Sequence, residues 1–337
     1  MATQKNTQKD SRRNVRKSGK KSPIDRARGG VAVWAVDPFE QDSKRVSAAH
    51  ELIDNFAVAL AWKVQPISVI GPMDVNWPIE LKGSLRGNIA QVAQNSLSPA
   101  FEDITRDALM LEPRVLVQPT PSLTASVDYL LASAQKDKAQ VIALNTHGRR
   151  GLLHFRLGSF AETVIACSKI PVLTMNPKAT VPKRLSTIVV PTDFSSTSRR
   201  VFVKMLEWAC ALSNGGKVKI VLVHRFENPV PALFYGGGEI AVDSEVMRQM
   251  LEDAEGARRR QAEQWEKLAK NKGVDCETVM VTDNRALSAL ILSTAKDLKA
   301  DLIAMATYRG TIGQGFLGSV ARDVLLTAHC PVVIVHR

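Results

Sequence analysis

The 337-residue chain contains few aromatic residues and no long hydrophobic run. Aromatic side chains make up only 5% of it, and no segment approaches the roughly 18 to 20 consecutive apolar residues that a membrane-spanning helix needs. The first residues also lack the apolar stretch of a secretory signal peptide. We therefore expect no membrane span and a cytoplasmic location.

Cysteine is scarce as well, and its four occurrences are dispersed along the chain. They form neither a C-x-x-C pair nor a spacing with histidine that is typical of a zinc site. Dispersed thiols of this kind usually pack as small hydrophobic side chains. The sequence therefore indicates no metal site and no redox role for Cys167, Cys210, Cys276 and Cys330.

Positive charge is concentrated at the N-terminus. Residues 1–30 hold ten lysine and arginine residues against two acidic ones, and so contribute +8 of the net charge of +12. Because its large apolar residues are only Met1, Val15 and Ile24, this tail is predicted to be disordered. It could bind a polyanion such as nucleic acid weakly, through counterion release and without reading sequence. A solubilising arm with no dedicated partner is the alternative.

The length of the chain suits two domains of about 150 residues each. An internal repeat supports this division, because Gly158 and Gly318 are 160 positions apart and Pro171 and Pro331 have the same separation. We therefore expect a first domain at residues 31–176, a linker at 177–184 and a second domain at 185–337.

Strand and helix patterns alternate in both halves. Apolar runs at 31–36 and 186–192 end in Asp37 and Asp193, and nearly unbroken runs of this kind are typical of strands buried on both faces. Amphipathic helices with apolar residues at three- and four-residue steps follow both aspartates. The alternation predicts two doubly wound α/β domains with mostly parallel sheets and helices on both faces. Their ligand crevices should lie beyond the carboxyl ends of the strands.

Further elements are predicted from the same patterns. The helical stripes run over residues 46–60 and 201–212, and Ser195 or Ser196 is the expected N-cap of the second helix. Additional strands are expected at 67–70 and 218–223, and a long helix at about 243–270.

A glycine-containing segment at residues 145–159 carries the chemistry expected of the first domain. A glycine loop between a strand and a helix can point several backbone N–H groups at an anion, and glycine lets phosphates approach the chain closely. The frame consists of Thr146, His147 and Gly148, then nine residues, then Gly158 and Ser159.

This frame resembles the universal stress protein family. Its ATP-binding members carry a glycine, two residues, a glycine, nine residues, and a glycine followed by serine or threonine. The stretch from Pro191 to Ser195 is similar to the family's first strand and turn. The resemblance extends over most of residues 31–337 in two passes. It implies a tandem stress-response or regulatory protein whose domains have five-stranded, adenine nucleotide alpha hydrolase-like folds.

In the first domain the resemblance implies a site for ATP or a related adenine nucleotide. The expected residues are Asp37 for the ribose or adenine, and Asn145, His147, Gly148, Gly158 and Ser159 around the phosphates. Asn145 stands where the family has its first glycine, and asparagine tolerates left-handed backbone better than most residues. As an alternative, the aspartate and the glycines could serve only in turns and caps.

The second domain departs further from the family pattern. Gly318 and Ser319 match it, while Met305 and Tyr308 occupy the two earlier glycine positions and are expected to crowd the phosphates. These two matching residues and Asp193 are therefore weaker candidates, and Asp193 is expected to have a structural role.

Two classes of function remain after this comparison. The first is a nucleotide-responsive regulatory protein, and the alternative is an interaction or scaffold module whose phosphate loops have lost their ligand. An enzyme is disfavoured, because the sequence has no Walker lysine, no metal cluster and no nucleophile with a placed base. We therefore predict no catalytic residues, and at most slow, incidental ATP hydrolysis. The halves are expected to form an intrachain pseudo-dimer through residues 172–175 and 332–335, with homodimerisation left open.

Overall fold

The computed structural model of the chain describes residues 29–37, 43–71, 91, 109–146, 157–212, 217–226, 244–306 and 317–336. Most of the basic tail lies outside the described residues, as do His147, Gly148 and Tyr308. Among the described helices, none combines the length and apolar character required to cross a membrane.

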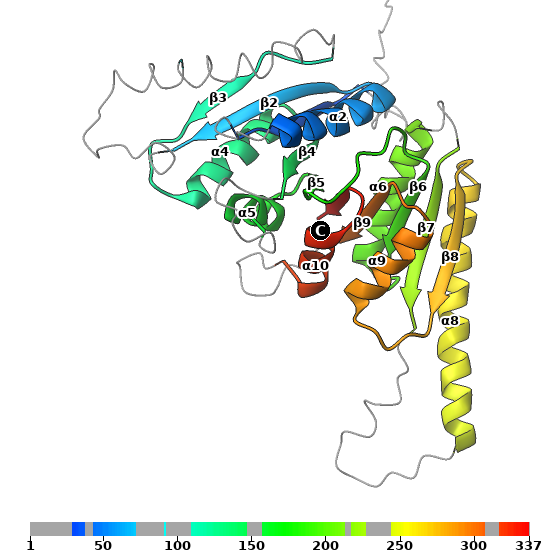
Figure 1. Cartoon of the computed structure of the whole chain (residues 1–337). Coiled ribbons are helices and arrows are strands. Elements are labelled where there is room, and N and C mark those ends of the chain that lie inside the picture. The colour runs from blue at the N-terminus through cyan, green and yellow to red at the C-terminus, as the bar shows by residue number, and fades with distance from the viewer. Residues whose placement is uncertain are drawn as a thin grey trace, which may run out of the picture.

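Strands and helices alternate through both halves of the chain (Figure 1). The N-terminal half comprises β1 (Val31–Ala35), α2 (Ser43–Leu60), β2 (Lys63–Ile70), β3 (Arg114–Val117), α4 (Leu123–Lys136), β4 (Ala139–Asn145), α5 (Ser159–Cys167) and β5 (Val172–Met175). The C-terminal half comprises β6 (Thr187–Pro191), α6 (Ser196–Leu212), β7 (Lys219–Arg225), α8 (Ser244–Lys270), β8 (Asp275–Val281), α9 (Leu287–Asp297), β9 (Leu302–Ala306), α10 (Ser319–Thr327) and β10 (Val332–Val335).

The strands form one sheet of ten, in the order β3-β2-β1-β4-β5-β10-β9-β6-β7-β8. Read outward from the central pair, both halves have the same order, with the last strand innermost and the third strand at the edge. Every pairing within a half is parallel. The predicted α/β fold with a mostly parallel sheet is therefore confirmed.

The two halves meet where their last strands pair in antiparallel fashion. Leu173 lies opposite Val333 at the centre of this pairing, and the Thr174 hydroxyl donates a hydrogen bond of 3.1 Å to the carbonyl of Val332. The contact expected between residues 172–175 and 332–335 is thus formed within the chain. The C-terminal end consequently lies at the centre of the molecule (Figure 1).

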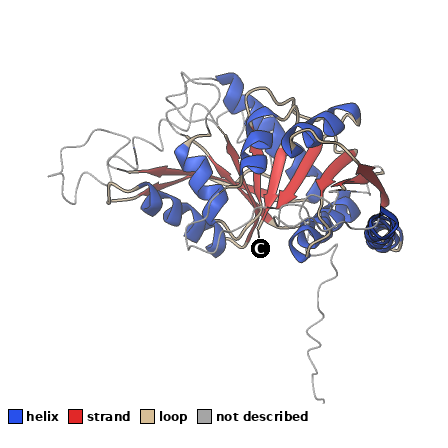
Figure 2. Ribbon diagram, turned by 90° about the horizontal axis from the view of Figure 1, so that it is seen from below, coloured by secondary structure: helices blue, strands red, loops and turns tan. Residues whose placement is uncertain are grey.

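Helices cover both faces of the sheet (Figure 2). Helices α2, α6 and α8 contribute to one hydrophobic cluster, and α4, α5, α9 and α10 contribute to the other. Both clusters contain residues from both halves, so the cores are shared across the central strand pair. On the α2 and α6 face, the buried Trp208 ring contacts Phe56 and Trp62 edge-on, with ring centroids 5.7 and 5.4 Å away.

The connecting segment is held against both halves. The Thr180 amide donates to the carbonyl of His329 at 2.8 Å, and the Asn55 side chain donates to the carbonyl of Pro182 at 3.0 Å. These two bonds tie residues 177–184 to α2 on one side and to the approach to β10 on the other. The linker is therefore anchored to both halves.

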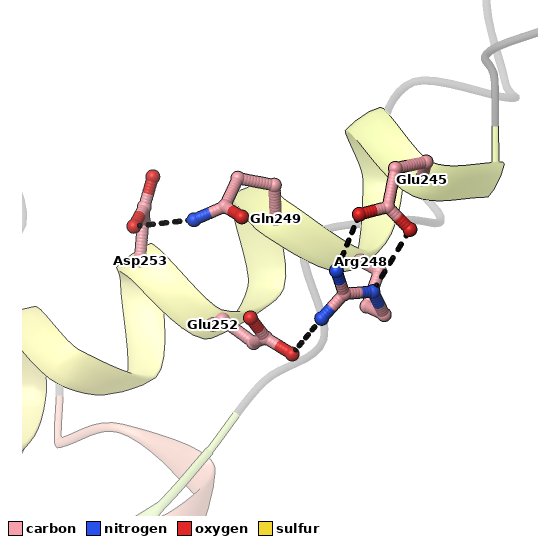
Figure 3. Close-up of polar contacts among 5 residues, drawn as sticks. All are labelled: Glu245, Arg248, Gln249, Glu252 and Asp253. Atoms are coloured by element: carbon pink, nitrogen blue, oxygen red, sulfur yellow. Dashed lines mark hydrogen bonds and ion pairs between the residues drawn. The ribbon is translucent and has the colours of Figure 1, made fainter.

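Helix α8 extends well beyond the sheet (Figure 1), and its outer turns are polar. Arg248 reaches Glu245 on one side and Glu252 on the other, and Gln249 donates to Asp253 at 3.2 Å (Figure 3). Pairs at these spacings support an exposed helix by a few tenths of a kcal/mol each. The hydrogen bonds from Arg248 also lower the pKa of Glu245.

Candidate functional site

The carboxyl ends of β1 and β4 meet at one edge of the sheet in the N-terminal half. Trp34 lies opposite Ala143 in the parallel pairing of these strands. Because Asp37 and Thr146 each come three residues later, both lie beyond that edge, as the doubly wound fold requires of a ligand crevice. Asp37 is partly buried there.

Thr146 forms the base of the predicted phosphate loop. Its side chain is fully buried, its amide donates to the carbonyl of Met175 at 3.1 Å, and its own carbonyl accepts the Gly158 amide at 2.8 Å. The last bond closes the loop between β4 and α5, bringing its two ends together. Residues 147–156, which include His147 and Gly148, lie between these ends and outside the described part of the chain.

The N-terminus of α5 lies at this edge, and no side-chain cap is found for it among the described residues. Gly158 occupies the N-cap position and supplies no side-chain hydrogen bond, as is also true of Gly318 at α10, whereas Ser122 caps α4 with a hydroxyl that accepts the Ala125 amide. The first amides of a helix have no partner within the helix and attract anions when no side chain caps them. Ser159, the first residue of α5, is exposed and could add a hydroxyl donor.

The backbone at Gly158 does not require glycine. Its φ of −62° and ψ of 137° suit any residue. A turn requirement therefore does not explain this glycine, whereas close approach of another group would. Asn145 is an extended residue of β4 paired with Met175, so the left-handed conformation considered from the sequence is not used at this position.

The corresponding turn of the C-terminal half is filled by its own hydrogen bonds. Asp193 Oδ1 accepts the Ser195 amide at 2.9 Å and the hydroxyl of Ser198. The Ser195 hydroxyl accepts the Ser198 amide at 3.2 Å, which makes Ser195 the N-cap of α6. Asp193 thus stabilises the start of a helix, and these contacts favour a structural role for it.

His224 on β7 makes a second group of contacts with the same turn. The buried ring of His224 lies 4.9 Å from that of Phe194, and its Nδ1 donates to the carbonyl of Thr192 at 2.8 Å. Phe194 has a φ of 59°, which costs backbone energy that its packing must offset. The sequence gives no signal for this role of His224, because its hydrogen-bond partner Thr192 is 32 residues away.

The second phosphate loop differs from the expectation at one of its two substituted positions. Met305 is only 6% exposed and belongs to the hydrophobic cluster that also holds Leu317 and Ala321. Its side chain therefore packs in the hydrophobic core, and the second position, Tyr308, lies outside the described residues. At Gly318, an added Cβ would meet no atom within 4 Å.

Other chemistry finds little support in the described residues. They contain no cluster of three or more metal-ligating side chains. Burial raises the pKa of the Cys330 thiol to about 12, which leaves it protonated and unreactive. A surface groove of about 590 Å³ is lined mainly by α6 together with Lys169 and His336, and none of the expected nucleotide residues lines it.

The strand order and the parallel pairing within each half define a doubly wound α/β fold, with Asp37 after its first strand and Gly158 at the helix that follows its fourth. The model of the universal stress protein family matches residues 126–175 and 185–336, which is more than half of the chain. The chain therefore belongs to the universal stress protein family.

Known relatives agree with this assignment. A Thermus aquaticus protein described as "Universal stress protein in QAH/OAS sulfhydrylase 3'region" is 36% identical over 118 residues, covering 35% of this chain and 77% of the relative. A universal stress protein structure from Archaeoglobus fulgidus covers 91% of this chain and 98% of its own length, with 17% identity and a TM-score of 0.58. A putative universal stress protein from Pseudomonas aeruginosa covers 94% and 95%, with 14% identity and a TM-score of 0.57. Both structures share the fold of this chain.

Proposed function

We propose that this stress-response protein binds ATP or a related adenine nucleotide in its N-terminal half. The phosphates would lie at the open N-terminus of α5, against the amides around Gly158, with the Ser159 hydroxyl as a further donor. Asp37, at the same sheet edge, would accept hydrogen bonds from the ribose or the adenine. Asn145, His147 and Gly148 complete the proposed site. None of these residues is assigned a catalytic role.

The uncapped start of α5 is the observation that carries the proposal. A glycine stands there although its backbone angles suit any residue, and it offers no side-chain cap. Both facts fit a place where an anion approaches the helix closely. Gly318 at the start of α10 shares both features, so the preceding family glycine, kept as Gly148 and replaced by Tyr308, is what favours the N-terminal half. Asp37 lies three residues beyond the strand register that aligns β1 with β4. One crevice could therefore hold a nucleotide with its ribose beside Asp37 and its phosphates at the start of α5.

We assign the C-terminal half a different part. Its β6 turn is occupied by the bonds of Asp193 to Ser195 and Ser198, which leaves this carboxylate engaged in capping. The half would then act as a pseudo-symmetric partner that completes the sheet and supports the nucleotide-binding half. Under this proposal the domains comprise residues 31–176 and 185–337.

Nucleotide analysis of the purified full-length protein tests the proposal. Heat denaturation should release adenine nucleotide that chromatography identifies, or else calorimetric titration with ATP should give a binding signal. Gly158→Val should weaken binding by about tenfold or more, the effect of a loss of 1.4 kcal/mol. The matched variant Gly318→Val should leave it unchanged. Purified protein that releases no nucleotide and gives no binding signal with ATP would overturn the proposal. The interaction module would then be the remaining function.

The interaction module is favoured by one specific observation. The position of the family's first glycine is held by Asn145, and its counterpart Met305 is buried in the core. If this second function holds, both glycine variants would leave partner binding intact, and affinity capture with the folded protein would recover the same partners with or without added ATP.

A further inference from the structure

The central strand pair relates the two halves by an approximate twofold axis. Residues 160 positions apart are equivalent in the repeat, and Leu173 and Val333, which have this separation, lie directly opposite each other. The flanking pairs obey the same relation, because Val172 faces Ile334 and Thr174 faces Val332. The axis therefore passes close to the pair of Leu173 and Val333, and each half presents equivalent positions to the other.

One pair of equivalent positions carries opposite charges. Glu162 in α5 and Arg322 in α10 are 160 positions apart, and the Arg322 guanidinium donates to Glu162 Oε1 across the boundary between the halves. Their side chains are 32% and 47% exposed. An exposed ion pair contributes little to stability. It can still influence which partner binds when the alternative partner would bring like charges together.

Self-pairing of either half would create that alternative. A twofold axis brings each position against its own copy, so two N-terminal halves would set Glu162 against Glu162 and two C-terminal halves would set Arg322 against Arg322. Only a mixed pair joins opposite charges. This arrangement disfavours both homotypic pairs at once.

A second pair of equivalent positions is also asymmetric. Asn176 donates to the carbonyl of Ala328 at 2.8 Å, while His336, 160 positions later, donates through Nε2 to the carbonyl of Ile165. Both side chains are buried and both bonds cross between the halves. Ile165 and Ala328 are not equivalent in the repeat, so the amide and the longer imidazole reach different turns of the opposing helices. The two sides of the interface are therefore not interchangeable.

We propose that the central interface is built so that each half binds the other half and rejects a copy of itself, with Glu162 and Arg322 as the residues that determine this choice. The inference is independent of the proposed nucleotide site. It concerns the contact of α5 with α10 and would stand if the protein bound no nucleotide.

A nicked form of the full chain tests the proposal. A protease site placed at the exposed residues Lys183 and Arg184 allows the linker to be cut after folding. The nicked protein is exposed to mild urea and returned to buffer, so that the halves can exchange, and native mass spectrometry counts mixed and homotypic pairs. The unsubstituted protein should give mixed pairs in clear excess over the half that random exchange would produce.

Charge variants separate this explanation from general packing. Glu162→Arg makes all three kinds of pair carry two arginines, so homotypic pairs should rise by up to about fivefold relative to mixed ones, toward the statistical proportion, because one exposed charge contact no longer discriminates. Arg322→Glu should act in the same way with two glutamates. The double variant E162R/R322E restores opposite charges and should restore mixed pairs. As a matched control, Glu255→Arg breaks an ion pair within α8 and should leave the distribution unchanged.

Homotypic pairs in statistical proportion in the unsubstituted protein would overturn the proposal, as would a double variant that behaves like the single ones. If the separated halves aggregate, urea unfolding of the four intact chains decides the question. The stability lost in each single variant should then be regained in the double variant, and additive losses would overturn the proposal.

Discussion

Trp208 offers the sharpest test of how the halves depend on each other. Its indole is fully buried on α6 and contacts Phe56 and Trp62, which belong to the N-terminal half. Trp208→Ala would leave a cavity between the halves and should cost about 3–5 kcal/mol of unfolding free energy. Each edge-on aromatic contact accounts for about 0.5–1.5 kcal/mol beyond its buried area.

Urea unfolding followed by far-UV circular dichroism measures this loss. Because the two cores are shared across the sheet, the variant should still unfold in one transition, at a lower urea midpoint. Trp265→Ala serves as the control, since its ring stacks on Phe202 at 4.9 Å within the C-terminal half. It should be destabilising without involving the N-terminal half directly.

A double-mutant cycle separates the two tryptophans. Phe56→Ala combined with Trp208→Ala should show a coupling of about 0.5–1.5 kcal/mol, because these rings touch. Phe56→Ala combined with Trp265→Ala should be additive within about 0.5 kcal/mol. Two separate unfolding transitions in Trp208→Ala, together with no coupling to Phe56, would refute the reasoning that the halves share a core through this side chain.

Two further predictions concern the unfolding free energy at alkaline pH and the basic tail. The buried thiol of Cys330 has its pKa raised to about 12, whereas an exposed thiol in the unfolded chain titrates near 8.5. Above about pH 9 the unfolded state therefore loses a proton that the folded state keeps, so unfolding free energy should fall as pH rises, and less steeply in Cys330→Ala. Equal slopes in urea titrations of the two proteins would contradict this. Removal of residues 1–28 should abolish weak, salt-dependent binding to a labelled oligonucleotide in fluorescence anisotropy. Unchanged binding would assign it to the folded part.

Much of the fold could be predicted from local patterns. The apolar stripes at 46–60 and 201–212 lie within α2 and α6, the long helix expected at about 243–270 is α8, and Ser195 is one of the two N-caps considered. Strand ends were less well defined. β2 begins at Lys63 rather than Ile67, because residues 63–66 pair with β1 and residues 64–66 are buried although they do not form an apolar run.

The sequence by itself determined the order of strands and helices, the repeat and the apolar last strands that pair at the centre, because periodicity and burial of short runs are local properties. Only the tertiary structure decided which residues meet across the halves. The contact of Glu162 with Arg322 and that of Phe56 with Trp208 join positions more than a hundred residues apart. Such contacts depend on how the two halves dock, which no local pattern in the chain specifies.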